Sequence, residues 1–234
     1  MSDFGIIGIG RIGTSMARNM SSKGIIVSLY DKSHNSLDNL KNDYPELDSS
    51  LVFDDINKFI SSISKPRKVL ILVPSGPALD EVISLLIQHL DSNDILIDGG
   101  NTNPNVSFEN HQTIKSKNLL YLGMGVSGGV KGVLEGPSIM IGGDTNAFDR
   151  VKNIFSQITS KTINGSKSFE FFGDSNQGHF VKMIHNGIEY VEMQLISSIY
   201  YLMINSKKYS YEDVAKIFNK WNDIDLNSYL LEIS

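Results

Sequence analysis

The sequence contains no cysteine, which excludes disulfide bonds, thiolate nucleophiles and thiolate metal sites. Basic residues do not dominate either, because 21 lysines and arginines against 26 acidic residues give a net charge of −5. Such a chain has no broad positive field for nucleic acid or an anionic membrane surface. It also has no long apolar run and no basic leader. We therefore expect a cytoplasmic protein without nucleic-acid or membrane partners.

The apolar share of 41% over 234 residues suffices for one large domain, or for one domain and part of a second. Unbroken apolar runs alternate with helix-like segments along most of the chain. Apolar strands that alternate with helices predict an α/β fold, with a doubly wound parallel sheet covered on both faces. The expected strands are 4–8, 25–30, 69–73, 95–97 and 119–122, and the expected helices are 12–23, 34–43, 54–63, 77–90 and 105–117.

The pattern changes toward the C-terminus. Runs at 138–141 and 169–172 flank a helix near 146–159 and are expected to add a strand or two at one sheet edge. After Asp174 only helices are expected, at 177–205, 210–221 and 225–233. We therefore predict two domains, residues 1–174 and the first helices of an all-helical domain in 175–234. An apolar stripe in the last helix requires a partner chain or further helices to cover it; it consists of Leu226, Tyr229, Leu230 and Ile233.

A glycine-rich turn, Gly8-Ile9-Gly10-Arg11-Ile12-Gly13, joins the first strand to the first helix. Gly8 permits the tight turn, Gly10 lets the backbone approach a pyrophosphate, and Gly13 allows close packing of helix and strand. Asp31 ends the second strand, where a carboxylate accepts hydrogen bonds from ribose hydroxyls. The combination predicts a Rossmann-type dinucleotide site, and a glycine turn without a ligand is the alternative.

The residues after the second strand bear on the choice of cofactor. The carboxylate of Asp31 repels a 2′-phosphate, which favours NAD over NADP. Lys32 and Ser33 follow directly and would soften that preference.

Two further glycine loops follow strands of the expected sheet. Asn101 ends the sequence Asp98-Gly99-Gly100-Asn101, and Ser127 precedes Gly128 and Gly129. Ligands of open α/β sheets bind beyond the carboxyl ends of the strands, and bare amides beside a hydroxyl suit a carboxylate or phosphate oxygen. Either loop alone is more often a simple turn. Together with the nucleotide turn they predict a substrate site at one sheet edge.

The helix expected at 177–205 carries a cluster of polar groups. At 100° per residue, His185, Asn186 and Glu189 lie within about 60° of Lys182. A buried side is predicted from apolar residues at three- and four-residue spacing, namely Phe180, Ile184, Ile188, Val191, Leu195 and Ile199. Proton-transfer chemistry is one interpretation of the polar face, and a solvated Lys–Glu pair is the other.

The chain resembles the decarboxylating 6-phosphogluconate dehydrogenases, within the β-hydroxyacid dehydrogenase superfamily, from its first strand to its last residue. The other superfamily members share the spacing of Gly178, Lys182 and Asn186 but generally lack His185 and the continuation 187–190. The motifs that carry the resemblance are Ile97-Asp98-Gly99-Gly100-Asn101, Gly125-Val126-Ser127-Gly128-Gly129, Gly136-Pro137-Ser138 and Gly178-His179-Phe180-Val181-Lys182-Met183-Ile184-His185-Asn186-Gly187-Ile188-Glu189-Tyr190.

The resemblance implies oxidative decarboxylation of 6-phosphogluconate to ribulose 5-phosphate and CO₂, with reduction of NAD or NADP, in the pentose phosphate pathway. It assigns Lys182 as the general base toward the 3-hydroxyl and Glu189 as the acid that protonates the enediol. No metal site is implied. Substrate contacts are expected from Asn101, Ser127, Gly128, Gly129, His185, Asn186 and Tyr190, the last with the phosphate. Cofactor contacts are expected from Gly8, Gly10, Arg11, Ile12, Gly13, Asp31, Lys32, Ser33, Val73 and Asn101.

The chain departs from the family pattern in several places. An Asn-Arg-Thr-like triplet is common where this chain has Asp31-Lys32-Ser33, and the loss of its arginine resembles the NAD-preferring branch. Family members often have Ala or Val at Gly10 and Arg11, and a lysine at Pro74. The family continues into a larger helical domain, so the chain is expected to be the front part of a longer protein, or a short form, and to act as a homodimer. Another β-hydroxyacid dehydrogenase, or a nucleotide-binding protein without turnover, are the alternatives.

Overall fold

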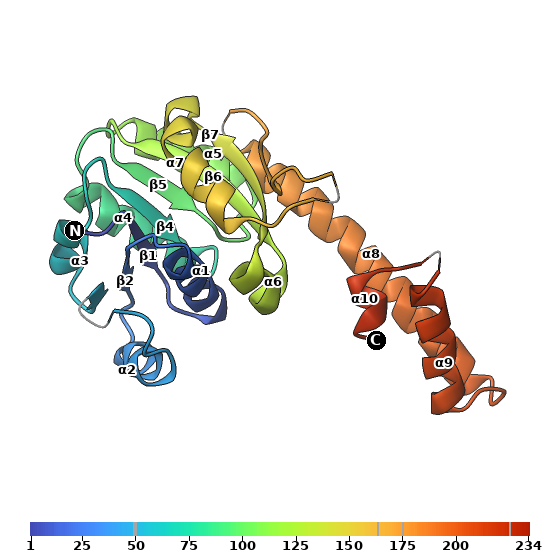
Figure 1. The fold of residues 1–234 in the computed structure, drawn as a ribbon. Helices are drawn as coiled ribbons and strands as arrows, with labels where there is room; N and C mark the ends of the chain where they lie inside the picture. Colours follow the sequence, from blue (N-terminus) through green and yellow to red (C-terminus); the bar gives the residue numbers. More distant parts are fainter. Residues whose placement is uncertain (49–50, 163, 175, 225) are drawn as a thin grey trace. The chain divides into compact units, whose positions relative to one another are not determined.

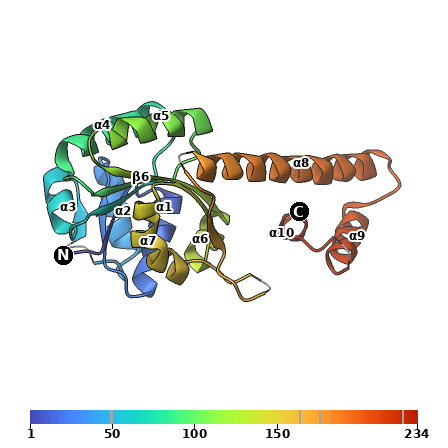
Figure 2. The same ribbon diagram turned by 90° about the horizontal axis from the view of Figure 1, so that it is seen from above.

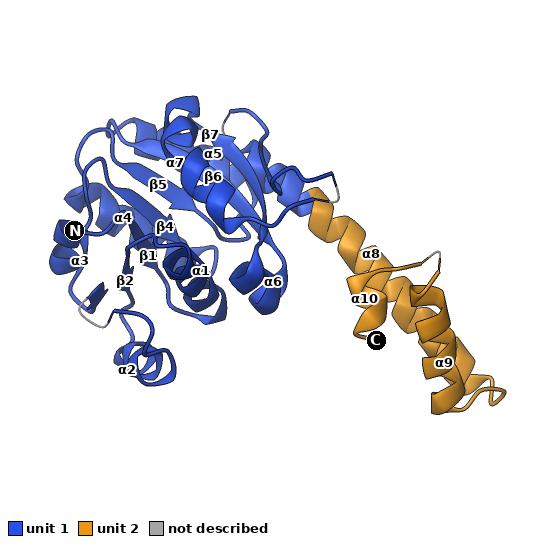
Figure 3. Ribbon diagram, viewed as in Figure 1, with its two compact units in different colours: residues 1–183 blue, residues 184–234 orange. Residues whose placement is uncertain are grey.

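The computed structural model describes residues 1–48, 51–162, 164–174, 176–224 and 226–234. The chain divides into two compact units, residues 1–183 and 184–234 (Figure 3). The division falls inside one long helix, after the predicted boundary at Asp174. Residue 175, with which the predicted second domain begins, lies outside the described residues, and that boundary stays a prediction.

The first unit is built on an eight-stranded sheet with the order β3-β2-β1-β4-β5-β6-β7-β8. The strands from β3 to β6 pair in parallel, β7 is antiparallel to β6, and β8 is parallel to β7. The predicted α/β fold with a doubly wound, mostly parallel sheet is confirmed, and so are the extra edge strands. The bounds are β1 Phe4–Ile7, β2 Val27–Tyr30, β3 Val52–Phe53, β4 Lys68–Ile71, β5 Ile95–Asp98, β6 Leu120–Ser127, β7 Ser138–Gly143 and β8 Phe169–Phe171.

Helices cover both faces of this sheet (Figures 1 and 2). Figure 2 shows α4 and α5 on one side of the sheet and α1, α6 and α7 on the other. The first side comprises α3 (Ile56–Ser62), α4 (Pro77–His89) and α5 (Pro104–Lys115). The second comprises α1 (Arg11–Ser22), α2 (His34–Asp43), α6 (Gly129–Glu135) and α7 (Thr145–Ile158). The two-residue β3 and the short α6 were not predicted from the sequence.

Each central strand contributes side chains to both faces, which explains why these strands read as unbroken apolar runs. In β5, Ile95 and Ile97 lie in the cluster with α1, whereas Leu96 lies in the cluster with α4. All three are fully buried. Alternation along a strand therefore builds two separate apolar cores, one on each face.

The helices after the sheet are α8 (Gln177–Asn205), α9 (Tyr211–Asn222) and α10 (Tyr229–Glu232). A reciprocal capping box begins α9, in which Ser210 accepts from the Asp213 amide and the Asp213 carboxylate accepts from the Ser210 amide. The last predicted helix, 225–233, is longer than the observed α10, and residue 225 lies outside the described residues. Ser228 caps α10 by accepting from the Leu231 amide.

Candidate active site

The glycine-rich turn joins β1 to α1, as predicted. Gly8 has a φ of 93°, and a side chain there would lie 2.6 Å from the Leu72 carbonyl oxygen. A side chain at Gly13 would collide with the carbonyl oxygen of Gly8. At Gly10, by contrast, nothing lies within 4 Å of the added carbon. Gly8 and Gly13 are therefore required by the fold, and Gly10 leaves open space where a ligand can approach the backbone.

Asp31 is held against this turn by the main chain. One carboxylate oxygen accepts from the Ile9 amide at 3.0 Å and the other from the Ser33 amide at 2.9 Å. Lys32 is exposed and pairs with Glu81 at 2.9 Å, and Ser33 caps α2. The structure thus brings Asp31 to the glycine turn and gives the neighbouring lysine a carboxylate partner of its own.

The remaining predicted cofactor residues lie around the same turn. Arg11 is exposed, and Ile12 is partly buried against the core beneath α1. A side chain on Gly8 would meet Val73 Cγ1 at 3.0 Å, which places Val73 beside the turn, just after β4. Because β1, β4, β5 and β6 are parallel neighbours, their carboxyl ends and the following loops share one sheet edge.

The loop after β5 is held in shape by Asp98. This fully buried carboxylate accepts from the Gly100 amide at 3.0 Å and from the Thr102 hydroxyl at 2.8 Å. Asn101 lies between these two anchored residues and is exposed. The loop therefore presents the Asn101 carboxamide from a backbone fixed on both sides.

The loop after β6 differs from its prediction in one respect. Ser127 is the last residue of β6, and Gly128 adopts a φ of 129°. Gly129, predicted as loop, is the first residue of α6. The short helix escaped prediction because its sequence, Gly129–Glu135, contains two glycines and only two turns. Ser127 and the two glycines still lie at the same edge as Asn101.

The start of α8 lies directly on the backbone of β6 and β7. A side chain on Gly178 would collide with the Gly123 carbonyl oxygen and would lie 2.6 Å from the Gly142 amide nitrogen. Glycine is needed here because the two backbones are in contact. This close approach fixes the first turns of α8 against the sheet.

Lys182 is buried in this contact, with 7% of its surface exposed. Its Cγ would lie 2.8 Å from a side chain added at Gly125, so the lysine stem crosses β6 at that glycine. Gly125 and Ser127 are two residues apart and therefore face the same side of the strand. The first unit thus brings Lys182 to the strand end that carries Ser127. Because Lys182 is buried, it does not belong to a solvated surface Lys–Glu pair.

The second unit brings together His185, Asn186 and Glu189. His185 Nδ1 lies 3.4 Å from Asn186 Oδ1 and 3.7 Å from Glu189 Oε2. These side chains are partly exposed, and Tyr190 is 68% exposed. The three polar groups form one local cluster on successive turns of α8.

The predicted buried side of α8 is wrong. The apolar residues expected there are all exposed, namely Phe180, Ile184, Ile188, Val191, Leu195 and Ile199. In its first turns the helix instead buries Gly178, His179 and Lys182 against the sheet. Farther along, it packs on α9 and α10 through Ile196, Met203 and Ile204. Apolar spacing shows which side of the helix favours burial, but these side chains stay exposed in the described chain.

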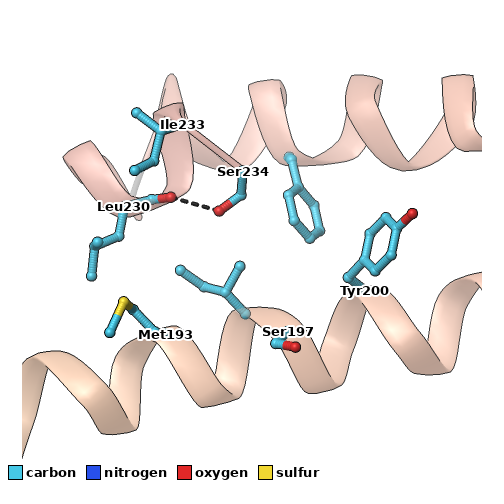
Figure 4. Close-up of a pocket in the computed structure, with 8 residues that line it drawn as sticks. Met193, Ser197, Tyr200, Leu230, Ile233 and Ser234 are labelled. Carbon is cyan, nitrogen blue, oxygen red and sulfur yellow. Dashed lines mark hydrogen bonds between the residues drawn. The ribbon is translucent and has the colours of Figure 1, made fainter.

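A hollow of about 390 Å³ lies within the second unit, between α8 and the C-terminal residues (Figure 4). Met193 and Tyr200 of α8 face Leu230 and Ile233, and the Ser234 hydroxyl donates to the Leu230 carbonyl oxygen at 2.6 Å. No lysine, histidine or acidic side chain is among its described lining residues, and most of these residues are apolar. Over the described ranges there is no cluster of three metal-ligating residues and no helix suited to crossing a membrane.

Sequence reasoning missed a buried polar cluster beneath the Asn101 loop. It joins Asp98 and Thr102 to Ser107, Tyr121 and His179. Burial, followed by the Asp98 carboxylate, raises the pKa of Tyr121 well above its usual value. Asp98 and His179 stand within the quoted motifs, but only the three-dimensional contacts reveal that they meet. The one signal available in the sequence was an acidic residue, Asp98, directly after the apolar run 95–97.

Comparison with known proteins supports the reading of these motifs. Residues 3–166 match the family model for the NAD binding domain of 6-phosphogluconate dehydrogenase, and residues 178–234 match that for its C-terminal domain. Curated relatives named 6-phosphogluconate dehydrogenase, decarboxylating, include one from Staphylococcus epidermidis, 38% identical over 98% of this chain and 49% of its own length. One from Cunninghamella elegans is 36% identical over all of this chain and 48% of its own. The chain spans about half the length of the curated relatives it matches.

Solved structures agree on the fold. The structure of Plasmodium falciparum 6-phosphogluconate dehydrogenase has a TM-score of 0.90 and 38% identity to this chain. The match covers 99% of this chain and 50% of the Plasmodium chain, which was studied with NADP⁺ and with 6-phosphogluconate. Mycobacterium tuberculosis 3-hydroxyisobutyrate dehydrogenase, at 19% identity and a TM-score of 0.76 over 98% of this chain and 73% of its own, shares the fold. By its matching family model and its motifs, the chain belongs to the 6-phosphogluconate dehydrogenase family.

Proposed function

We propose that the protein oxidatively decarboxylates 6-phosphogluconate to ribulose 5-phosphate and CO₂ and reduces NAD(P) in the process. One observation carries the proposal. Lys182 is buried on β6 beside the strand-end loops that present Asn101 and Ser127, at the sheet edge of the open Gly10 turn. The position of this lysine, at the same sheet edge as the nucleotide turn, suits proton transfer during hydride removal.

Lys182 acts first as the general base in this proposal. Its neutral amine takes the proton of the substrate 3-hydroxyl while the hydride of C3 leaves, and the hydroxyl carbon becomes a ketone. Bound NAD(P) supplies the hydride acceptor. The 3-keto acid then loses its carboxylate as CO₂, the electrons of the broken bond form an enediol, and Lys182 returns its proton to the carbonyl oxygen. The lysine is thus neutral again when the enediol has formed.

Glu189 completes the sequence by protonating the carbon that becomes C1 of ribulose 5-phosphate, while Lys182 takes back the proton of the neighbouring enediol hydroxyl as the C2 ketone forms. His185 and Asn186 support this role, because they form a local cluster with Glu189 in α8. Helical spacing puts Lys182, His185, Asn186 and Glu189 on one stripe. We infer that Asn101, Ser127, Gly128, Gly129, His185 and Asn186 hold the sugar acid and that Tyr190 contacts its phosphate.

We infer a preference for NAD over NADP. The Asp31 carboxylate is fixed at the turn by the Ile9 and Ser33 amides, where it would face the ribose of a bound nucleotide. A 2′-phosphate placed there would meet a fixed negative charge. Lys32 does not offset this charge freely, because it pairs with Glu81. Arg11 is an exposed cation in the same glycine-rich turn and could still contact a nucleotide phosphate.

We also infer that the protein forms a homodimer. The exposed apolar side of α8, including Ile188, Val191 and Leu195, is the kind of surface that protein partners cover. Closed two-fold dimers are the commonest soluble assemblies. A second copy of the chain is therefore the partner that we propose for this surface.

The test uses the longest polypeptide that the gene encodes and follows both reduced nicotinamide and CO₂. With 6-phosphogluconate we expect turnover with either nucleotide and a higher kcat/KM with NAD. Lys182→Met should lower kcat at least ~10²-fold, the usual size of a general-base contribution. Lys216→Met is the matched control, because Lys216 forms an exposed pair with Glu212 one helical turn away. It should leave kcat unchanged.

Three outcomes would contradict the proposal. Equal rates for the Lys182 and Lys216 variants would show that Lys182 takes no part in the chemistry. Turnover of a different hydroxy acid, with none of 6-phosphogluconate, would point to another β-hydroxyacid dehydrogenase. Nucleotide binding in a calorimeter without turnover of any acid would identify a nucleotide-binding protein.

A further inference from the structure

The five polar side chains beneath the Asn101 loop come from five separate parts of the first unit. Asp98 ends β5, Thr102 follows in the loop, Ser107 lies in α5, Tyr121 in β6, and His179 in the first turn of α8. All five are buried. A polar cluster at this depth has to satisfy its hydrogen-bonding groups internally, because water does not reach them.

Asp98 and Ser107 hold the two sides of the loop that carries Asn101. Asp98 accepts from the Gly100 amide and the Thr102 hydroxyl on one side of the cluster. Ser107 lies one turn into α5, which begins directly after the loop, and its Oγ is 3.0 Å from the Tyr121 hydroxyl oxygen. The Tyr121 hydroxyl also lies 3.4 Å from Asp98 Oδ2. The loop is therefore closed on both sides by one connected network.

His179 connects this network to α8. Its Nδ1 lies 2.8 Å from Ser107 Oγ, and its Nε2 lies 4.0 Å from Asp98 Oδ2. The ring lies directly over the backbone of β6, because a side chain on Gly123 would lie 2.9 Å from Nδ1. Within the described structure Nε2 has no hydrogen-bond partner. A buried imidazole with one unpartnered nitrogen is a costly way to fill space.

The protonation state of His179 fits a bridging role. Burial lowers the pKa of His179, and the Asp98 carboxylate and the carbonyl groups of Asp98 and Gly100 offset this only in part. The neutral ring fits the network when Nδ1 accepts from the Ser107 hydroxyl and Nε2 carries its proton on the side of Asp98, whose Oδ2 lies 4.0 Å away. In this arrangement the ring bridges α5 and the end of β5 without adding a charge.

We propose that His179 is a positioning residue that fixes the Lys182 turn of α8 relative to the Asn101 loop. His179 and Lys182 are three residues apart and share one face of α8. His179 lies over Gly123 and Lys182 over Gly125, so both residues seat the helix on β6. The same His179 ring contacts Ser107, in the helix that follows the loop. Any rotation of α8 that moves Lys182 would break this contact.

The expected effect of His179 on catalysis rests on the proposed function, but its role in holding the Asn101 loop can be tested without measuring turnover. The first experiment measures amide hydrogen exchange in the purified chain. His179→Ala should raise exchange of the Gly100 amide about tenfold, the scale of one lost hydrogen bond. His179→Asn should restore most of the protection, because its side-chain amide reaches the position of Nδ1. Ser107→Ala should act in the same direction, and it serves where His179→Ala does not fold.

His111→Ala is the matched control. His111 is also buried, lies in α5 and stacks on the Tyr121 ring at 5.4 Å, but its Nε2 faces Asp144 at 3.2 Å and not the loop. A loss of stability without loop opening is expected for this variant. Equal exchange of the Gly100 amide in the His179 and His111 variants would overturn the proposal, and so would a failure of asparagine to restore protection.

The second experiment uses the full-length protein and separates binding from chemistry. His179→Ala should lower kcat for 6-phosphogluconate ~10²-fold, the cost of misplacing catalytic groups by about 1 Å. The Kd for nucleotide should change much less than kcat, because the Gly8–Gly13 turn shares no residue with the cluster and Asn101 is the expected cofactor contact nearest to it. Equal loss of nucleotide affinity and of kcat would indicate general damage and contradict a positioning role. If the parent protein shows no turnover, the proposed function fails, and the exchange experiment still decides the role of His179.

Discussion

The two units of the chain use apolar side chains in opposite ways. In residues 1–183, two large clusters of side chains are buried on the faces of the sheet, and residues such as Phe4, Ile71 and Phe155 are fully buried. In residues 184–234, the described buried apolar side chains are Val214, Phe218 and Leu231. Large exposed ones are common there, as Tyr190, Leu202 and Ile233 illustrate at 61% or more.

The difference shows that an apolar pattern and a completed core are separate properties. The first unit contains both the apolar faces and the elements that cover them, so its fold follows from its own residues. The second contains helices with apolar sides but few covering elements. Its small cluster supplies little stability of its own, since stability rises with the apolar area removed from water. The predictions below test this contrast.

The largest effect is expected where α8 contacts the sheet. Gly178→Ala would place a side chain against the backbone of Gly123 and Gly142, neither of which can yield as a flexible side chain would. We expect a loss of at least about 3 kcal/mol in the free energy of unfolding of the first unit. Denaturant unfolding monitored by circular dichroism would measure it.

Gly187→Ala is the matched control in the same helix. Nothing lies within 4 Å of a side chain added at Gly187, so only the helix propensity changes. Alanine is favoured over glycine in a helix interior by about 1 kcal/mol, so this variant should be slightly more stable than the parent. If both variants destabilise the chain equally, the backbone contact at Gly178 is not what attaches α8 to the sheet.

A smaller effect is expected within the second unit. Leu231 is buried in the cluster with Val214 and Phe218, and Leu231→Ala should cost about 2 kcal/mol, the low end for a buried leucine because the cluster is small. Leu226→Ala removes the same atoms from a side chain that is 57% exposed, and should cost less than about 0.5 kcal/mol. Hydrogen exchange in α9 would report both values.

Exchange in the sheet strands should not change in either leucine variant. If Leu231→Ala also loosened the strands, the two units would unfold together, and the contrast between them would not extend to stability. Equal effects of Leu231→Ala and Leu226→Ala would show that the small cluster contributes no more than an exposed residue.

The sequence predicted most elements of the first unit because local and tertiary preferences agree there. Apolar runs such as 95–97 lie between two covered faces, and glycines at Gly8 and Gly13 meet backbone that excludes a side chain. The two-residue β3 and the glycine-containing α6 have no comparable periodic pattern. They form because neighbouring strands and helices hold them, which a local pattern does not record.

The buried side of α8 and the His179 cluster could not be predicted for a related reason. Spacing identified Ile188 and Leu195 as an apolar side, but the covering element is not encoded in the spacing of the helix itself. The contact between His179 and Ser107 joins residues separated by 72 positions, and it depends on how close α8 approaches β6. Such contacts depend on the close approaches of Gly178 to Gly123 and of Lys182 to Gly125, which appear only once the fold is known.

The smallest effect on folding, and the clearest one on assembly, is expected on the exposed side of α8. Ile188 and Leu195 are 65% and 59% exposed and seven residues apart, which puts them two turns apart on the same side. Replacing both by lysine should change the free energy of unfolding of the isolated chain by less than about 0.5 kcal/mol, because neither is buried in it. If a second copy covers this side, two buried lysines would instead prevent association.

Sedimentation velocity across a range of concentrations measures this association directly. The parent should form a dimer whose fraction rises with concentration, and the Ile188→Lys/Leu195→Lys variant should remain a monomer over the same range. Tyr211→Lys is the control, since Tyr211 is 71% exposed in α9 and lies on a different helix. A parent that stays monomeric, or a Tyr211 variant that dissociates equally, would show that the apolar side of α8 is covered by something other than a second copy. The exposed apolar side of α8 would then be the binding surface of a different partner.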